Sequence, residues 1–263
     1  MNTHQTSRDR EAQRFSKRNI FRAELIYGQG FNSPGGTAAI DMLCKDVPKF
    51  PGMSILDVGC GSGGAAFHFA RNYEAKVVGV DCVAEMLTLC RERHQEQSHL
   101  PIEFQQGDIQ TLPLDANTFD LVWSRDVFMY LEDNEKSWRK IYNVLKPGGY
   151  FVYVDFFKGY SDISQKFVDY MKICNYYLQN LYECDRLLRE LGYEVMRTVD
   201  ITAWIADLYG DNLVELAQNE AEFVREYGRS DYDHIVSRWH GKIEYGRQKD
   251  LLHGLAIARK PKE

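Results

Sequence analysis

The feature that most constrains the fold is a glycine-rich turn directly after a short apolar run. Residues 53–58 have the apolar character of a buried strand, and residues 59–64 then read Gly-Cys-Gly-Ser-Gly-Gly. Glycine adopts positive φ angles and leaves the backbone bare, so that a ligand can approach it closely. A helical pattern over 64–72 follows at once. A strand, a glycine turn and a helix in this order predict the ligand-binding edge of a doubly wound α/β sheet.

The centre of the chain alternates short β-branched runs with helical periods, which predicts a parallel sheet covered on both faces. The expected strands are residues 53–58, 76–80, 102–106, 119–123, 150–156, 193–201 and 251–259. The expected helices are residues 10–27, 64–72, 84–95, 135–144, 165–191 with one break, and 204–227.

Composition excludes several classes of protein. Hydrophobic residues make up 44% of the chain and aromatic residues 13%, which rules out a disordered chain. No apolar run approaches the roughly 20 residues that span a bilayer, and the N-terminal residues are too polar for a secretory signal, so we expect a cytoplasmic protein without a membrane partner. The net charge of −6 argues against a nucleic-acid partner. The six cysteines lack zinc-like spacing, so reduced thiols and no metal site are expected.

Two acidic positions make the glycine turn more specific. Asp81 ends the second expected strand about 20 residues after the turn, where a carboxylate can accept hydrogen bonds from two ribose hydroxyls. Asp108 and Ile109 follow the third strand, where an acid and an apolar neighbour can hold an adenine. A nicotinamide dinucleotide is disfavoured, because Asp57 precedes the first glycine and no second glycine turn appears.

Residues 145–149 read Leu-Lys-Pro-Gly-Gly, and with the motifs above they make residues 53–156 resemble a class I S-adenosylmethionine-dependent methyltransferase. The resemblance implies an α/β fold with a doubly wound, Rossmann-like seven-stranded sheet, an N-terminal helical lid and helical insertions. It implies S-adenosyl-L-methionine as the cofactor. The residues implied to bind it are Phe31, Ser33, Asp57, Gly59, Gly61, Asp81, Cys82, Met86, Asp108, Ile109, Ser124 and Arg125.

The same resemblance predicts one methyltransferase domain over 1–263. Its expected parts are an N-terminal lid (1–45), a cofactor-binding core (46–157), a helical cap with the sixth strand (158–250) and the last strand (251–263).

A narrower resemblance lies outside the core. Residues 26–36 and the pair Trp239 and Lys242 resemble segments of the phosphoethanolamine N-methyltransferases. That family has a catalytic tyrosine on the lid and a catalytic histidine after the fourth strand, and the resemblance implies that these positions are Phe15 and Tyr130 here.

The phosphate anchors of that family are also altered in this sequence. The family's tyrosine, arginine, tyrosine and lysine correspond to Phe156, Cys174, Tyr176 and Lys242. Cysteine cannot replace the bidentate fork that arginine offers to a phosphate.

The candidate acceptor-binding residues are Arg14, Phe15, Phe156, Tyr160, Tyr176 and Lys242. Aromatic faces stabilise alkylated ammonium groups by about 0.5–2 kcal/mol each. An amine acceptor must also lose a proton, and the candidate groups for that step are Tyr130, Asp126 and His240.

The first functional expectation is N-methylation of a small amine or amino-acid-like acceptor. A phosphoethanolamine-type substrate is a close variant, and O- or C-methylation of an aromatic metabolite is an alternative, since Tyr130 can orient a phenol. A cofactor-binding module without turnover is the non-enzymatic alternative. The intact glycine turn, Asp81 and Asp108 disfavour it.

Overall fold

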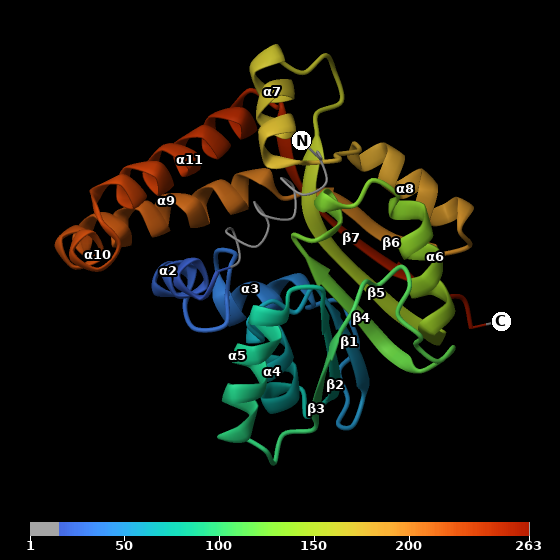
Figure 1. The fold of residues 1–263 in the computed structure, drawn as a ribbon. Coiled ribbons are helices and arrows are strands. Elements are labelled where there is room, and N and C mark those ends of the chain that lie inside the picture. The colour runs from blue at the N-terminus through green and yellow to red at the C-terminus, as the bar shows by residue number, and fades with distance from the viewer. Residues whose placement is uncertain (1–15, 263) are drawn as a thin grey trace, which may run out of the picture.

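The computed structural model describes residues 16–262, and within them seven strands form one sheet with helices on both faces (Figure 1). The strands are β1 (Ser54–Val58), β2 (Lys76–Asp81), β3 (Ile102–Gln106), β4 (Phe119–Arg125), β5 (Leu145–Lys158), β6 (Glu194–Asp200) and β7 (Leu251–Arg259). Their order in space is β3-β2-β1-β4-β5-β7-β6. The first five pair in parallel as expected, whereas β7 runs antiparallel to both β5 and β6, so the sheet is mixed.

The helices follow most of the expected pattern. They are α2 (Lys17–Tyr27), α3 (Gly36–Leu43), α4 (Gly64–Asn72), α5 (Ala84–Gln95), η1 (Phe128–Tyr130), α6 (Asn134–Val144), α7 (Gln165–Cys174), α8 (Leu181–Glu190), α9 (Thr202–Gln218), α10 (Glu220–Tyr227) and α11 (Arg229–Arg247). The break expected within 165–191 falls after Asn175, which adopts φ 56° and ends α7. Two helices, α3 and the 19-residue α11, were not expected as such.

The glycine turn joins β1 to α4. Gly59, Gly61 and Gly63 adopt φ angles of 71°, 53° and 97°, a region that residues with a Cβ atom rarely enter. The amides of Gly59 and Cys60 donate to the Val80 carbonyl at 2.8 and 3.0 Å. The turn is therefore tied to the end of the neighbouring strand, and this places it at the carboxyl edge of the sheet.

Each face of the sheet has its own apolar core. Helices α3, α4 and α5 lie on one side of the sheet, and α6 and α8 lie on the other (Figure 1). Ala39, Ile40 and Leu43 of α3 are fully buried in the first core. Residues 36–43, which the sequence assigned to the lid, therefore pack as part of the main core.

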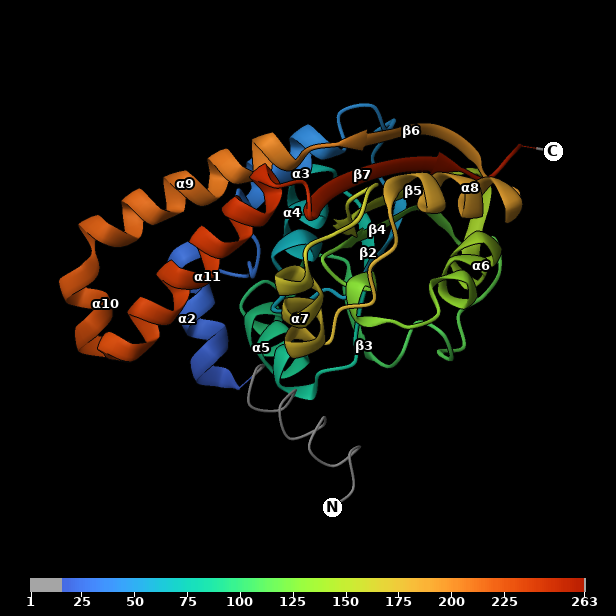
Figure 2. The ribbon, with the colours of Figure 1, turned by 90° about the horizontal axis from the view of Figure 1, so that it is seen from above.

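Helices α9, α10 and α11 form the cap between β6 and β7. Both views show α9 and α11 side by side (Figures 1 and 2), and α2 contacts α9. Tyr209, Trp239 and Phe223 lie in the apolar cluster that holds these helices together. No helix among residues 16–262 is long and apolar enough to cross a membrane.

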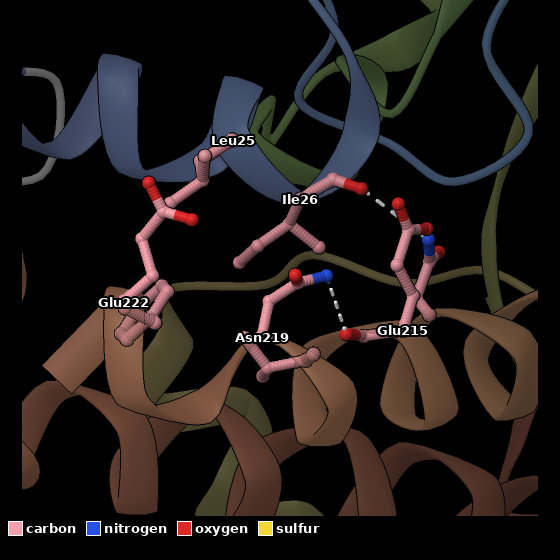
Figure 3. A pocket seen from close by; sticks show the side chains of 8 residues that line it. Leu25, Ile26, Glu215, Asn219 and Glu222 are labelled. Carbon is pink, nitrogen blue, oxygen red and sulfur yellow. Dashed lines mark hydrogen bonds between the residues drawn. The ribbon is translucent and has the colours of Figure 1, made fainter.

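A cavity of about 220 Å³ separates α2 from the far end of the cap. Figure 3 shows Leu25 and Ile26 of α2 facing Glu215, Asn219 and Glu222 across it. The Asn219 side chain donates to the Glu215 carbonyl at 3.0 Å, which closes the end of α9. Apolar packing between α2 and the cap is incomplete here, so α2 needs another attachment to the core.

That attachment is a buried carboxylate on α2. Glu24 Oε1 accepts hydrogen bonds from the Gly30 amide at 3.0 Å and the Ser62 hydroxyl at 2.6 Å. The Arg93 guanidinium donates to both Glu24 oxygens at 2.8 and 2.7 Å, and also to the Ser62 carbonyl at 2.8 Å. The side chains of Glu24 and Arg93 are 7% and 14% exposed, so water screens this pair weakly. One ion pair thus joins α2, the lid segment, the glycine turn and α5.

Replacing Glu24 with alanine should lower the free energy of unfolding by about 3 kcal/mol, because it leaves the Arg93 charge without its partner in a poorly solvated place. Urea denaturation at neutral pH measures the change. Glu92→Ala is the matched control, since this exposed carboxylate on α5 lies 3.8 Å from the Lys17 amine and should contribute less than about 1 kcal/mol. Equal losses in both variants would contradict the role given to Glu24.

Candidate active site

The candidate site lies where the carboxyl ends of β1, β2 and β4 meet. In the sheet order β1 stands between β2 and β4, so the chain leaves β1 toward one side and later returns on the other. Ligands of doubly wound sheets bind in the crevice at this switch of direction. Asp57 lies at the end of β1 and Gly59 directly follows that strand. Asp81 ends β2, and Ser124 and Arg125 end β4, so the fold brings these predicted residues to one edge.

Asp81 is held rigidly at the mouth of the turn. Its Oδ2 accepts from the Gly61 amide and its Oδ1 from the Val83 amide, both at 2.9 Å. Burial raises the pKa of the Asp81 carboxyl, while these backbone hydrogen bonds oppose the rise. Each oxygen keeps a further lone pair for an outside donor. A diol is the ligand group that such a fixed pair of acceptors fits.

Asp57 is a buried acceptor with spare capacity. Its residue is only 2% exposed, and Oδ2 has no hydrogen-bond partner within residues 16–262. Burial, and then the charge of Asp81, raise the pKa of Asp57 to about 8, while a hydrogen bond from the Ala66 amide acts in the opposite direction. A cationic ligand group placed beside this carboxyl would stabilise its ionised form. The unpartnered oxygen and the bare glycine backbone together fit S-adenosylmethionine, which carries an ammonium and a sulfonium.

The lid segment crosses directly over the glycine turn. The Gly64 amide donates to the Gly30 carbonyl at 3.0 Å. A Cβ atom built on Gly64 would lie 2.7 Å from that carbonyl oxygen and 2.8 Å from the Phe31 ring, so only glycine permits this contact. A Cβ on Gly61 would meet the Asn32 side chain at 3.2 Å. Phe31 thus packs on the turn, as expected of a residue that covers the cofactor.

The lid is also bound to the end of β4. Ser33 donates a hydrogen bond to the Asp126 carboxylate, and Arg125 donates to the Pro34 carbonyl at 2.8 Å. Arg125 Nε lies 3.8 Å from Asp126 Oδ2, so the two charges are paired. Asp126 adopts φ 59°, an unusual backbone angle for this residue. Its buried Oδ1 has no hydrogen-bond partner within the described residues and can accept a proton or a donor group from a ligand.

A buried carboxylate that was not predicted holds the next turn. Asp155 Oδ2 accepts from the amides of Val127, Phe128 and Met129 at 3.2, 2.8 and 3.2 Å, and Oδ1 accepts from the Phe156 amide at 2.7 Å. Burial raises the pKa of Asp155 strongly. These bonds fix η1 and therefore Tyr130 at its end. The available signal was an acidic residue within an otherwise apolar strand.

Tyr130 faces a group of aromatic rings. Its ring centroid lies 5.5 Å from that of Tyr176, which in turn lies 5.6 Å from Phe156. The Lys242 amine lies 4.7 Å from the centre of the Phe156 ring and donates to the Tyr209 hydroxyl at 3.0 Å. The structure therefore brings Tyr130, Phe156, Tyr176 and Lys242 together, as the sequence predicted.

His253 of β7 lies behind this group and was not predicted. Its ring is 4.3 Å from Phe156, and burial lowers its pKa well below the usual value, followed by the charges of Lys242 and Arg125. The imidazole is neutral at pH 7 and forms part of the pocket wall.

Several predicted site residues lie elsewhere. His240 is exposed on α11, two residues from both Arg238 and Lys242 and so on the opposite side of the helix. Tyr160 is 64% exposed in the loop after β5 and does not enclose the pocket. Met86 is buried in a small cluster with Ile20 and Leu89.

The remaining predicted residues surround the crevice in different ways. Ser124 is fully buried and donates to the Val58 carbonyl at 3.1 Å, so it joins β4 to β1. Cys82 and Asp108 are exposed, whereas Ile109 is buried in the core. Arg14 and Phe15 lie outside the described residues.

Comparison with known proteins gives consistent matches. Residues 56–153 match the family model of a methyltransferase domain. A phosphoethanolamine N-methyltransferase of Triticum aestivum is 31% identical over 261 residues, which cover 97% of this chain and 52% of that protein. A sarcosine/dimethylglycine N-methyltransferase of Halorhodospira halochloris is 31% identical over 215 residues, which cover 80% of this chain and 76% of that protein.

A solved structure shows the same similarity in three dimensions. Phosphoethanolamine N-methyltransferase 2 of Haemonchus contortus, in complex with phosphomonomethylethanolamine and S-adenosylhomocysteine, superposes with a TM-score of 0.91 at 27% identity. The match covers 95% of this chain and 59% of that one. The chain spans about half the length of the curated phosphoethanolamine relatives that it matches.

These matches confirm the predicted fold and the predicted family. They extend over almost the whole chain. S-adenosylmethionine is the cofactor of this family. The chain belongs to the class I S-adenosylmethionine-dependent methyltransferases.

Proposed function

We propose that this protein transfers a methyl group from S-adenosylmethionine to the nitrogen of a small amine of the phosphoethanolamine or amino-acid type. The observation that carries the proposal is the crevice at the switch point, where the rigid Asp81 carboxylate and the unpartnered Asp57 oxygen face a glycine turn covered by the lid. The N-methyltransferases of Triticum aestivum and Halorhodospira halochloris, 31% identical to this chain, support the choice of nitrogen as the methylated atom.

Different residues of the chain bind the cofactor and the acceptor. Bound S-adenosylmethionine supplies a methyl group on a positively charged sulfur, which an electron pair of the acceptor displaces in line. Asp81 holds the ribose, and Asp57 faces the charged methionine part. Phe31 and the segment bound to Glu24 exclude water from above the turn.

On the acceptor side, the rings of Tyr130, Tyr176 and Phe156 form a wall for an alkylated ammonium group. An amine must lose its proton before or during attack. Asp126 Oδ1 and the Tyr130 hydroxyl are the groups we assign to accept or relay that proton, directly or through water. We place the reaction in the cytoplasm, a choice that the six free cysteines support. We assign a small-molecule acceptor, because the net charge of −6 disfavours a nucleic acid.

Methyl transfer from S-adenosylmethionine to a panel of acceptors tests the proposal. Ethanolamine phosphate, glycine, sarcosine, ethanolamine and a simple phenol separate the substrate classes. We expect transfer to an amine, and Asp81→Asn should weaken cofactor binding about 10- to 100-fold in calorimetry, because a charged acceptor is lost. Asp115→Asn, an exposed carboxylate elsewhere, is the matched control. Absence of cofactor binding by the wild type, or transfer only to the phenol, would refute the proposal.

Stability of the cofactor-free protein should depend on the ionisation of Asp57. Its pKa in the folded protein is about 8, above the usual 3.8, so the folded state binds more protons between these values and is destabilised as the pH rises from 4 to 8. In urea denaturation, the free energy of unfolding of Asp57→Asn should lack this pH dependence. Relative to the wild type it should rise by at most about 1.4 kcal/mol per pH unit. Parallel pH curves for wild type and variant would show that Asp57 is already ionised.

Tyr130→Phe removes one hydroxyl and keeps the ring that packs on Tyr176. We expect kcat to fall at least about 100-fold, the lower end of the range for a lost proton-transfer group, with an unchanged Kd for S-adenosylmethionine. Steady-state kinetics and calorimetry measure the two effects. Tyr182→Phe, which alters a ring that is 70% exposed, is the control. An unchanged kcat would remove Tyr130 from the proton step.

A further inference from the structure

One cation beside the aromatic rings has no counter-charge among residues 16–262. Three tyrosine hydroxyls and one thiol, on Tyr170, Tyr176, Tyr130 and Cys174, lie within electrostatic range of the Arg238 guanidinium. Within residues 16–262 Arg238 forms no hydrogen bond and no ion pair. Arg238 is partly buried, and burial removes water from around its charge.

The orientation of α11 directs this cation toward the pocket. Arg238, Lys242 and Tyr245 are four and seven residues apart and share one face of the helix. Lys242 reaches the Phe156 ring at 4.7 Å, and the Tyr245 ring lies 5.2 Å from Tyr170. The face of α11 that carries Arg238 is therefore the face that packs on this aromatic cluster.

The rings beneath this face connect it to the candidate proton acceptor. Tyr176 packs on Tyr170 at 6.0 Å, on Phe156 at 5.6 Å and on Tyr130 at 5.5 Å. An acceptor whose amine lies near Tyr130 would extend across Tyr176 toward α11. Its other end would then meet Arg238 and Lys242.

A partly buried guanidinium without a counter-ion is costly, and an anionic ligand removes that cost. Tyrosine hydroxyls and a thiol can accept hydrogen bonds from a guanidinium, whereas a carboxylate or a phosphate also balances its charge. The planar fork of arginine fits a carboxylate or a phosphate with two parallel hydrogen bonds.

We propose that Arg238, with Lys242 one turn further along α11, binds the anionic end of the methyl acceptor and selects amines that carry a phosphate or a carboxylate. The proposal rests on the proposed function. It also accounts for Cys174, which stands where the resemblance places an arginine: α11 supplies the guanidinium instead.

Binding and kinetics of two Arg238 variants test this assignment. Arg238→Gln removes the charge, and Arg238→Lys keeps the charge but removes the fork. We expect Arg238→Gln to raise both the KM and the calorimetric Kd for an anionic amine at least tenfold, with kcat and the Kd for S-adenosylmethionine within about threefold of wild type. Arg238→Lys should recover part of the loss. Ethanolamine, which has no anionic end, should bind equally to wild type and variants.

Arg247→Gln is the matched control, because this exposed arginine on the same helix lies 3.9 Å from Glu244 and outside the pocket. Ethanolamine phosphate and sarcosine form the two arms, and the arm with the larger loss identifies phosphate or carboxylate as the anion. An unchanged Kd for both, or equal losses for ethanolamine, overturns the proposal. Calorimetry separates this proposal from the proposed function. If anionic amines bind through Arg238 but are not methylated, the binding site is supported and the proposed reaction is refuted. If the wild-type protein binds neither amine, the binding site is refuted.

Discussion

The buried ion pair between Glu24 and Arg93 is the interaction on which the organisation of the site depends. Four parts of the chain meet at it: the lid helix α2, the segment at Gly30, the glycine turn at Ser62 and the helix α5. The apolar contact between α2 and the cap is interrupted by a cavity, so hydrophobic packing alone does not fix the lid. The lid position is instead set by directed polar contacts, and these include the backbone that would hold the cofactor.

A second buried carboxylate, that of Asp155, fixes the backbone on the acceptor side of the site. Asp155 accepts hydrogen bonds from amides of η1 and from the Phe156 amide, so the backbone at Tyr130 and at Phe156 belongs to one hydrogen-bonded unit. Asp126, Ser33 and Arg125 then connect that unit to the lid. The cofactor side and the acceptor side of the crevice are thereby held in a fixed relation, which is what an in-line displacement requires.

Local pattern was sufficient for much of the fold. The bounds of α4, α5, β3 and β7 were predicted to the residue, because periodicity and flanking turn residues define them. Helix α11 was not expected at its full length, since residues 229–247 include Gly241 and Gly246 and are polar on most sides. Helix α3 begins at two glycines that read as a loop.

The site was predictable to the extent that its residues follow strands. Asp57, Asp81 and Arg125 were found because strand ends meet at one edge of a parallel sheet. Arg238, Asp155 and Glu24 were not, because their partners lie far away in the sequence and no spacing rule connects them. His240 and Tyr160 were chosen because their residue types suit the chemistry, and the sequence did not indicate that both side chains are exposed.

The place of β7 between β5 and β6 has a consequence for how the chain folds. Strand β6 pairs with β7 alone within the described residues, and β7 follows it only after the three cap helices. During synthesis β6 therefore cannot pair, and the cap cannot be closed, until residues 251–259 have emerged, whereas β1 to β5 can already associate. Pairings of such large sequence separation form slowly. Nascent chains halted before residue 251 should thus carry a folded sheet of β1 to β5, in which the edge at β5 is still open to other strands.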